Sequence, residues 1–342
     1  MSKVIEMHVQ TASEPASPET VLEVHDLRTH FHTDDGVVKA VDGVSFAVRR
    51  GETLGIVGES GSGKSVACLS ALRLVPMPPA VHPTGEITFG GRNLLRLSEQ
   101  KVAQLRGNRL AMIFQDPLTA LNPYLTVARQ LTEVLEVHQG ATRAAARQAA
   151  VEMLTRVGIP DADHRIDQHP HQFSGGMRQR VMIAMALLCG PEVLFADEPT
   201  TALDVTIQAQ ILDLISDLQD TLGTAVVLIT HDLGVVAGTA DRVAVMYAGR
   251  IVEEGTTAEV FARPLHPYTR GLLASMPRLD TPPQDSLPAI PGLPPDLGRL
   301  PSGCPFHPRC DRADDHCRQE YPDWVVASPT HRAACWEAGP AR

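Results

Sequence analysis

The 342-residue sequence contains no long apolar run and no excess of positive charge. A membrane-spanning helix needs about 18 or more consecutive apolar residues, and no stretch approaches that length, so we expect no span. The 40 acidic residues outnumber the 30 basic ones, which gives a net charge of −10. Nucleic-acid-binding proteins normally carry a basic face, so this balance argues against such a partner, although it leaves room for a local basic patch.

The start of the chain also lacks the features of an export signal. Residues 1–20 contain no apolar core of the kind that a secretory signal requires, and we interpret them as a flexible tail. Six cysteines in a chain without such a signal point to thiol or metal chemistry rather than to disulfides. At 342 residues the chain can hold two domains, or one large domain with appendages.

The first half of the chain predicts an antiparallel sheet and then helices. Residues 21–31 and 37–48 alternate as strands on either side of a polar turn, and residues 86–89 predict another strand. Apolar residues in the segment 126–157 recur at helical spacing, with a break near Gly140. We therefore expect a small antiparallel sheet followed by two helices.

The second half predicts a parallel sheet. Apolar runs at residues 193–196 and 225–230 flank a helix expected at about residues 205–222, which is the alternation of an α/β fold. Residues 243–254 predict a closing hairpin. Seven prolines between residues 280 and 303 exclude regular helix or sheet there, so we expect an irregular connector.

The clearest motif is the glycine-rich stretch GESGSGKS at residues 58–65. It matches G-x-x-x-x-G-K-S/T, the P-loop that cradles nucleotide phosphates, and it stands between an apolar strand-like run and a segment of helical spacing. A Gly/Ser turn that matched the motif by chance would not need a strand before it and a helix after it. Glycines let backbone N–H groups turn toward a phosphate, and the following helix N-terminus favours anions. The residues expected to bind the phosphates are Gly58, Ser60, Gly61, Ser62, Gly63, Lys64 and Ser65.

A second motif supplies the acids that phosphoryl transfer needs. In the P-loop itself, Lys64 should reach the β- and γ-phosphates and the Ser65 hydroxyl should ligate Mg²⁺. The apolar run at 193–196 ends in Asp197 and Glu198. If this strand lies beside the P-loop strand, Asp197 reaches the Mg²⁺ and Glu198 reaches the water that faces the γ-phosphate. Without the P-loop, two acids at a strand end would simply be solvated.

Between these motifs lies FSGGMRQ at residues 173–179, and with it the chain resembles the ATP-binding subunits of ABC transporters. Their signature reads roughly LSGGQ; here Phe173 and Met177 replace its Leu and Gln, while the Ser-Gly-Gly core is intact. The resemblance implies that this helix N-terminus closes over the γ-phosphate bound by a partner subunit. The residues concerned are Ser174, Gly175 and Gly176.

Other landmarks of that family follow in order. Gln115 matches the Q-loop glutamine that contacts Mg²⁺ and water, and His231 matches the switch histidine that senses the γ-phosphate. The stretch TALD at residues 201–204, which ends in Asp204, matches the D-loop that touches the opposite subunit. Phe31 is the candidate for stacking on adenine, with Val38 as a neighbour that could contribute.

The resemblance also implies the fold and its divisions. We expect an α/β P-loop ABC nucleotide-binding domain, with a parallel core sheet, an antiparallel β-subdomain and a helical subdomain. The ATPase domain is placed at residues 21–262, with the helical subdomain at about 116–172. The flexible tail covers 1–20, and an irregular, cysteine-rich extension covers 263–342.

The implied mechanism is ATP hydrolysis between two domains packed head to tail. Glu198 would act as the general base, with His231 and Gln115 positioning water. The Mg²⁺ ligands would be Ser65, Gln115 and Asp197. Closing and reopening of the pair would then drive membrane subunits.

The end of the chain narrows the resemblance further. Residues 263–270 (RPLHPYTR) and the proline-rich stretch after them are similar to the extension of ABC importers for dipeptides, oligopeptides and nickel. The signature variant FSGGMRQR is that of their D-type subunit, which pairs with a non-identical F-type ATPase subunit. The implied partners are that subunit, two membrane-spanning permease subunits and an extracytoplasmic substrate-binding protein, with the chain at the cytoplasmic face of the membrane. A soluble ABC ATPase acting on nucleic acid or ribosomes fits less well, because the chain has one cassette and a negative charge.

Four cysteines close the sequence with the spacing C-x₅-C-x₆-C-x₁₇-C. Four thiols so close together could hold one metal ion or cluster, and the spacing lacks the C-x₂-C pairs that zinc sites favour. Some members of the importer group carry a 4Fe–4S cluster at a comparable place, so the resemblance implies one here, with zinc as the alternative. Disulfides are the third alternative for these cysteines. Free buried thiols are the simplest interpretation, above all for Cys68 and Cys189. The candidate ligands are Cys304, Cys310, Cys317 and Cys335.

Overall fold

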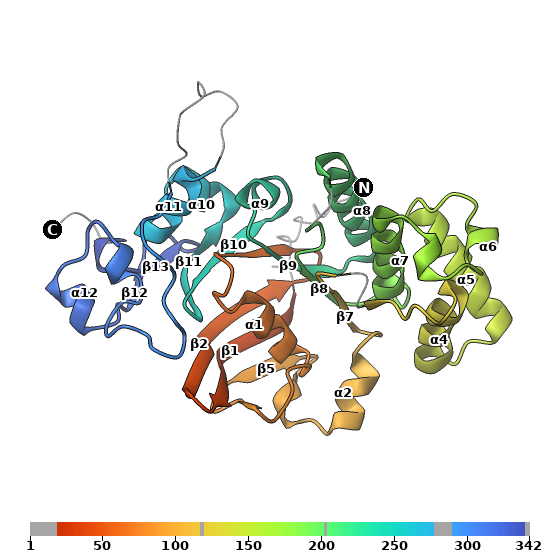
Figure 1. Cartoon of the computed structure of the whole chain (residues 1–342), viewed down its shortest axis with the longest axis horizontal. Helices are drawn as coiled ribbons and strands as arrows, with labels where there is room; N and C mark the ends of the chain where they lie inside the picture. Colours follow the sequence, from red (N-terminus) through yellow and green to blue (C-terminus); the bar gives the residue numbers. More distant parts are fainter. Residues whose placement is uncertain (1–18, 117–119, 202–203, 277–288, 339–342) are drawn as a thin grey trace, which may run out of the picture.

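The structure is a computed structural model, and it describes residues 19–116, 120–201, 204–276 and 289–338. Its main sheet has eight strands in the order β12-β13-β11-β10-β3-β9-β8-β7, and a smaller antiparallel sheet has the order β2-β1-β5-β6, with β4 paired to β1. Figure 1 shows the smaller sheet with α1 below the main sheet, and a group of helices on the far side of β7 and β8. This is the α/β architecture that the sequence predicts.

The smaller sheet consists of the predicted strands and two short additions. The bounds of its strands are β1 Thr20–Thr33, β2 Gly36–Arg49, β4 Ala80–Val81, β5 Glu86–Phe89 and β6 Arg92–Asn93. β1 and β2 pair antiparallel with Thr33 opposite Gly36, so the polar turn lies where the sequence places it.

The centre of the main sheet is parallel. Strands β10, β3, β9, β8 and β7 run parallel, and every residue of β3, β8 and β9 is buried. Continuous apolar runs of this kind are typical of parallel strands covered on both faces. The bounds of the strands are β3 Thr53–Val57, β7 Leu110–Ile113, β8 Val193–Asp197, β9 Ala225–Thr230, β10 Arg242–Tyr247, β11 Arg250–Thr256, β12 Trp324–Val326 and β13 Arg332–Ala334.

Most helices begin at a residue whose side chain caps the first turn. The helix break predicted near Gly140 is confirmed: Thr126 caps α4, and Gly140 ends it in a left-handed conformation, which glycine adopts without strain. The helices are α1 Lys64–Ala71, α2 Glu99–Leu105, α4 Val127–Gln139, α5 Arg143–Arg156, α6 Ala162–Arg165, α7 Gly175–Leu187, α8 Val205–Leu222, α9 Leu233–Thr239, α10 Thr257–Ala262, α11 Pro267–Ala274 and α12 Asp315–Gln319. Short 3-10 turns occupy Leu94–Arg96, Pro170–Gln172, His307–Arg309 and Trp336–Ala338. Cys189 lies in the turn after α7, where Gly190 has a positive φ of 66°.

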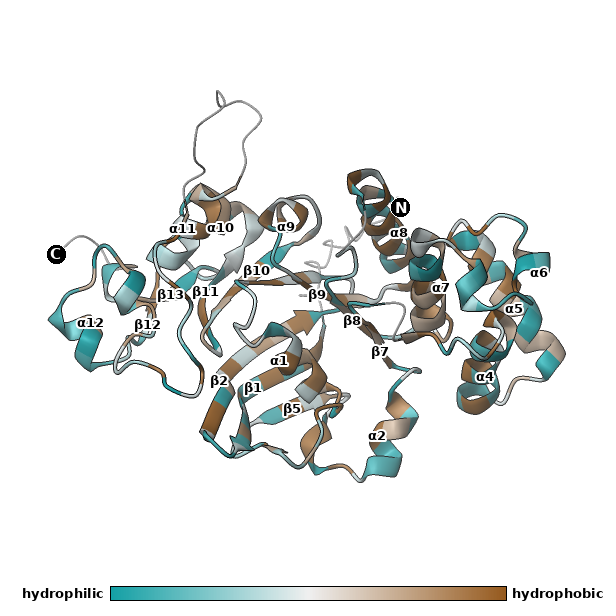
Figure 2. Cartoon of the chain, viewed as in Figure 1, coloured by the Kyte–Doolittle hydropathy of each residue, from teal (hydrophilic) through white to brown (hydrophobic). Residues whose placement is uncertain are grey.

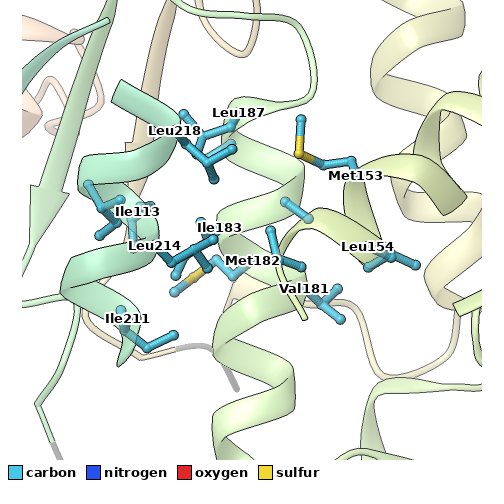
Figure 3. Packing of buried hydrophobic residues seen from close by; sticks show 14 of the residues in the cluster. Ile113, Met153, Leu154, Val181, Met182, Ile183, Leu187, Ile211, Leu214 and Leu218 are labelled. Atoms are coloured by element: carbon cyan, nitrogen blue, oxygen red, sulfur yellow. The ribbon is translucent and has the colours of Figure 1, made fainter. Parts of the chain in front are cut away.

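Three buried clusters hold these layers together. One joins α4, α5, α7 and α8 to β7 and β8, and Figure 3 shows Met182 and Ile183 of α7 facing Ile211 and Leu214 of α8. A second fills the space between the smaller sheet, α1 and the main sheet. A third lies under the C-terminal extension. In Figure 2 the hydrophobic colour follows the central strands, whereas α12 is hydrophilic.

The extension is more regular than the sequence suggests. Its strand β13 pairs with β11, with Ala333 opposite Glu253, and β12 pairs with β13, so the extension lengthens the main sheet. Both strands have three residues, which is too short for an alternating pattern to be recognised. Residues 289–303 contain no helix or strand, as predicted, while residues 280–288 of the proline-rich stretch lie outside the described residues. In the described ranges, no helix is both long and apolar enough to cross a membrane.

Candidate active site

The P-loop connects β3 to α1, and two of its glycines are required by close contacts. A Cβ on Gly58 would lie 2.1 Å from the Met246 carbonyl oxygen, and a Cβ on Gly63 would lie 2.1 Å from the Ala40 carbonyl oxygen. Real side chains never approach backbone so closely, so any other residue would displace the loop. The loop is therefore packed tightly against β2 and β10.

Lys64 is buried and folds back over the loop. Its Nζ donates to the carbonyl oxygens of Gly58 at 2.7 Å and Glu59 at 2.9 Å. Burial lowers the pKa of Lys64, and the nearby carboxylates of Glu198 and Asp197 oppose that effect. The cation thus lies between the loop and the acids at the end of β8.

Ser65 and Asp197 meet at the carboxyl ends of the parallel strands. The Ser65 hydroxyl donates to Asp197 Oδ1 at 2.9 Å. Burial raises the pKa of Asp197, and the negative charge of Glu198 raises it further. The hydrogen bond from Ser65 and the positive charge of Lys64 act in the opposite direction. Hydroxyl and carboxylate oxygens are the ligands that Mg²⁺ prefers, so this donor set fits the expected ion.

Glu198 is the centre of a second group of side chains. Its carboxylate accepts hydrogen bonds from Gln115 Nε2 at 2.8 Å and Thr201 Oγ1 at 2.9 Å, and lies 3.1 Å from His231 Nδ1. Burial alone would raise the pKa of Glu198. The hydrogen bonds from His231 and Thr201 and the charges of His231 and Lys64 have a larger effect, so the pKa lies below its usual value. The carboxylate is therefore ionised at neutral pH.

These groups come together because of the strand order. Gln115 follows β7, Glu198 follows β8 and His231 follows β9, and the three strands are parallel neighbours. Their carboxyl ends share one edge of the sheet with the P-loop, which follows β3. Glu198 also has a positive φ of 46°, a conformation that costs a non-glycine residue free energy.

The signature residues lie at the start of α7, apart from the P-loop. Ser174 caps this helix by accepting a hydrogen bond from the Met177 N–H at 3.4 Å. In Figure 1, α7 belongs to the helical group beyond β7 and β8, whereas α1 lies on the near side of the sheet. Within the described residues no hydrogen bond joins Ser174, Gly175 or Gly176 to the P-loop. The chain alone thus does not bring signature and P-loop together.

Two further predicted residues, Asp204 and Phe31, lie at the start of α8 and on β1. Asp204 caps α8 by accepting a hydrogen bond from the Ile207 N–H at 3.0 Å. Ala202 and Leu203 of the expected D-loop lie outside the described residues. Phe31 lies on β1, partly buried, directly opposite Val38 on β2, so the two residues expected near adenine are neighbours.

The four C-terminal cysteines line one cavity. Cys304, Cys310, Cys317 and Cys335 all contribute to its wall, and all are free thiols. Burial, reinforced by the neighbouring thiols, raises the pKa of Cys304 to about 11, and burial likewise raises that of Cys335 to about 11. Their chemistry suits a thiolate-bound metal. However, nowhere in the described ranges are three or more His, Cys, Asp or Glu side chains close enough to hold a metal ion.

One contact at the P-loop was not anticipated from the sequence. Arg309 of the extension forms an ion pair with Glu59, and the Tyr268 hydroxyl accepts a hydrogen bond from the Glu59 backbone N–H. Arg309 and Glu59 are 250 residues apart. No local pattern marks either side chain, so only the fold reveals their contact.

Comparison with known proteins agrees with this geometry. Residues 41–201 match the ABC transporter family, and residues 252–317 match the oligopeptide/dipeptide transporter C-terminal region. A probable peptide ABC transporter ATP-binding protein of Sinorhizobium fredii is 56% identical over 93% of this chain and 95% of its own length. The oligopeptide transport ATP-binding protein OppD of Bacillus subtilis is 54% identical over 92% of this chain and 88% of its own length.

Solved structures share the fold of the ATPase part. The dimeric ATP-binding cassette MJ0796, bound to ADP and Pi, superposes with a TM-score of 0.62 at 26% identity, covering 69% of this chain and 99% of that one. Together with the sequence relatives, this shows that the chain is an ABC-type ATPase. The chain belongs to the ABC transporter ATP-binding proteins, in the group that carries the oligopeptide/dipeptide transporter C-terminal region.

Proposed function

We propose that the chain is the ATP-hydrolysing motor subunit of an importer for oligopeptides or dipeptides, which it drives through membrane-spanning permease subunits. The observation that carries the proposal is the carboxylate of Glu198, bonded to Gln115 and close to His231 beside the P-loop. The substrate class follows from the printed names of the relatives, which are peptide transport proteins. Those names favour peptides over nickel.

In this proposal the P-loop and its neighbours bind Mg²⁺-ATP. Lys64 exchanges its two carbonyl partners for β- and γ-phosphate oxygens, and Phe31 stacks on adenine. Ser65, Asp197 and Gln115 would hold Mg²⁺ when it binds with ATP, and the ion would supply positive charge to the phosphates. The phosphate-binding residues are Gly58, Ser60, Gly61, Ser62, Gly63, Lys64 and Ser65.

Glu198 acts as the general base. Its carboxylate is ionised, so it can accept a proton from the attacking water as the oxygen bonds to the γ-phosphorus. Gln115 and His231 already contact this carboxylate, and in the catalytic state they orient the water against it. The leaving group is ADP.

A second ATPase subunit completes each site. Ser174, Gly175 and Gly176 at the N-terminus of α7 cover the γ-phosphate bound by the partner, and Asp204 lies at the same interface. The signature variant supports an F-type, non-identical partner rather than a second copy. The assembly is completed by two permease subunits and an extracytoplasmic substrate-binding protein, with this chain at the cytoplasmic face of the membrane.

The four cysteines hold a metal centre in this proposal. Cys304, Cys310, Cys317 and Cys335 would be its ligands, and the resemblance to importers that carry a 4Fe–4S cluster favours such a cluster over zinc. The extension would have to tighten around the centre, since the thiols line a common cavity without ligand geometry. Iron, sulfide and zinc analysis after anaerobic purification distinguishes a 4Fe–4S cluster, a bound zinc ion and a site without metal.

The test is ATP turnover by the complete transporter in lipid vesicles. Hydrolysis should rise when the substrate-binding protein is loaded with a di- or oligopeptide and should be coupled to peptide uptake. A nickel chelate serves as the comparison substrate. Stimulation by the chelate and not by peptides would replace the peptide assignment, and no ATP turnover would refute the motor role.

A further inference from the structure

We propose that the C-terminal extension positions the phosphate-binding loop, with Arg309 and Tyr268 as positioning residues that act through Glu59. The extension would thus help to set the affinity for ATP, and is more than an appendage to the ATPase domain. The proposal rests on the P-loop being the ATP site, as argued above.

The first link is a two-pronged ion pair between a buried arginine and a partly buried glutamate. Arg309 Nη1 lies 2.6 Å from Glu59 Oε2, and Nη2 lies 3.0 Å from Glu59 Oε1. The Arg309 side chain is 4% exposed and that of Glu59 is 27% exposed. Paired guanidinium–carboxylate bonds of this kind are strong and fix the relative orientation of both groups. Glu59 is the second residue of the P-loop, so the pair orients the loop itself.

The second link holds the backbone of the same residue. The Tyr268 hydroxyl, on the first turn of α11, accepts a hydrogen bond from the Glu59 N–H at 2.8 Å. Tyr268 is completely buried. The carbonyl oxygen of the same residue, Glu59, which belongs to the next peptide unit, accepts a hydrogen bond from Lys64 Nζ at 2.9 Å. The extension therefore fixes a loop residue whose carbonyl in turn holds the phosphate-binding lysine.

Arg309 is itself held rigidly. Its Nε donates to the Pro291 carbonyl oxygen at 2.9 Å, and its guanidinium carbon lies 5.9 Å from the ring centre of Tyr247 and 6.0 Å from that of Phe306. The Tyr247 and Tyr268 ring centres are 4.5 Å apart, and Phe306 contacts both rings. One aromatic cluster thus carries both positioning residues, and it restrains them before any ligand binds.

Such restraint should act on ATP affinity because the loop is rich in glycine. A glycine-rich segment has many accessible conformations, and only the one with its N–H groups turned inward can cradle a phosphate. Apparent affinity falls in proportion to the fraction of molecules in the competent conformation. If losing one link leaves the loop competent about a tenth of the time, the Kd for ATP rises about tenfold.

The experiment measures the Kd of Mg²⁺-ATP for the full-length chain by calorimetry, together with the melting temperature without nucleotide. Arg309→Ala and Tyr268→Phe should each weaken binding about tenfold. Arg309→Lys should recover part of the lost ATP affinity, because lysine keeps the positive charge but lacks the paired N–H donors of the guanidinium. In a Glu59→Gln background, Arg309→Ala should have a much smaller effect, since the two changes remove the same link.

The matched control is Arg332→Ala. Arg332 also ties the extension to the main sheet, with its Nε 2.8 Å from Glu254 Oε1 and its guanidinium stacked on Trp324, but neither partner belongs to the P-loop. Its removal should leave the Kd for ATP unchanged. An equal weakening in this variant, or unchanged affinity in both Arg309→Ala and Tyr268→Phe, would overturn the proposal.

A folding defect and a wrongly assigned ATP site can each be told apart from a failure of the positioning role. If Arg309→Ala does not fold, Tyr268→Phe decides, because it removes one hydroxyl and keeps the ring packing. If the unmodified chain fails to bind ATP, the assignment of the P-loop fails and not the role of the extension alone.

Discussion

Glu253 should be the anchor that fastens the extension to the ATPase core. This carboxylate on β11 is completely buried and accepts hydrogen bonds from the backbone N–H groups of Leu265 and His266, both at 2.8 Å. It also lies 2.8 Å from His331 Nε2, just before β13. A single side chain thereby joins the segment before α11 to the segment before β13.

Glu253→Ala removes all three bonds and leaves their donors buried. A buried donor without a partner costs about 1–3 kcal/mol, so the two backbone N–H groups alone should lower the free energy of unfolding by roughly 2–6 kcal/mol. The control is Glu254→Ala, one residue along the same strand. Its partner Arg332 has a side chain that is 37% exposed, and pairs of that kind contribute about 0–1 kcal/mol.

Urea unfolding of the purified chain measures both variants, with intrinsic Trp fluorescence reporting on the extension, where both tryptophans lie. We expect the midpoint to fall substantially for Glu253→Ala and little for Glu254→Ala. Equal midpoints for the two variants would refute the anchoring role of Glu253.

Three further predictions concern the nucleotide site, the metal centre and acid stability. Lys64→Ala should weaken ATP binding itself, measured by calorimetry; unchanged affinity would remove Lys64 from the phosphate site. Cys304→Ser with Cys310→Ser should abolish bound metal, and unchanged iron or zinc in the purified variant would rule out the four-cysteine centre. Hydrogen bonds, first that from Ser328, hold the pKa of Glu259 at about 2, below the usual 4.5, so its stabilising effect is present above pH 4.5 and is lost as the pH falls toward 2. The melting temperature of Glu259→Gln should therefore lie below that of the unmodified chain at neutral pH and converge with it near pH 2. A constant difference across that range would contradict the lowered pKa of Glu259.

The meeting of the candidate site residues at one sheet edge could be predicted from the sequence, because each residue stands in or directly after a recognisable local pattern. The P-loop is a contiguous motif, and Glu198 and His231 each follow an apolar run that forms a parallel strand. Parallel strands present their carboxyl ends at one edge, so order along the chain was enough to place these groups together.

The contacts of the extension could not be predicted, because they are not local. Arg309 and Glu59 come from opposite ends of the chain, and neither stands in a motif that requires the other. Glu253 was part of a predicted hairpin strand, but a buried carboxylate there has no signature in sequence. Strands β12 and β13 are too short to show a period.

The central claim is that Glu198 takes the proton from the water that attacks ATP. The most direct test measures ATP turnover by the reconstituted transporter and ATP affinity in parallel, for the unmodified chain and for Glu198→Gln. A general base contributes about 10²–10⁴ to the rate, so turnover should fall by about that factor while the Kd for ATP is preserved. Turnover at the unmodified rate in Glu198→Gln would contradict the account.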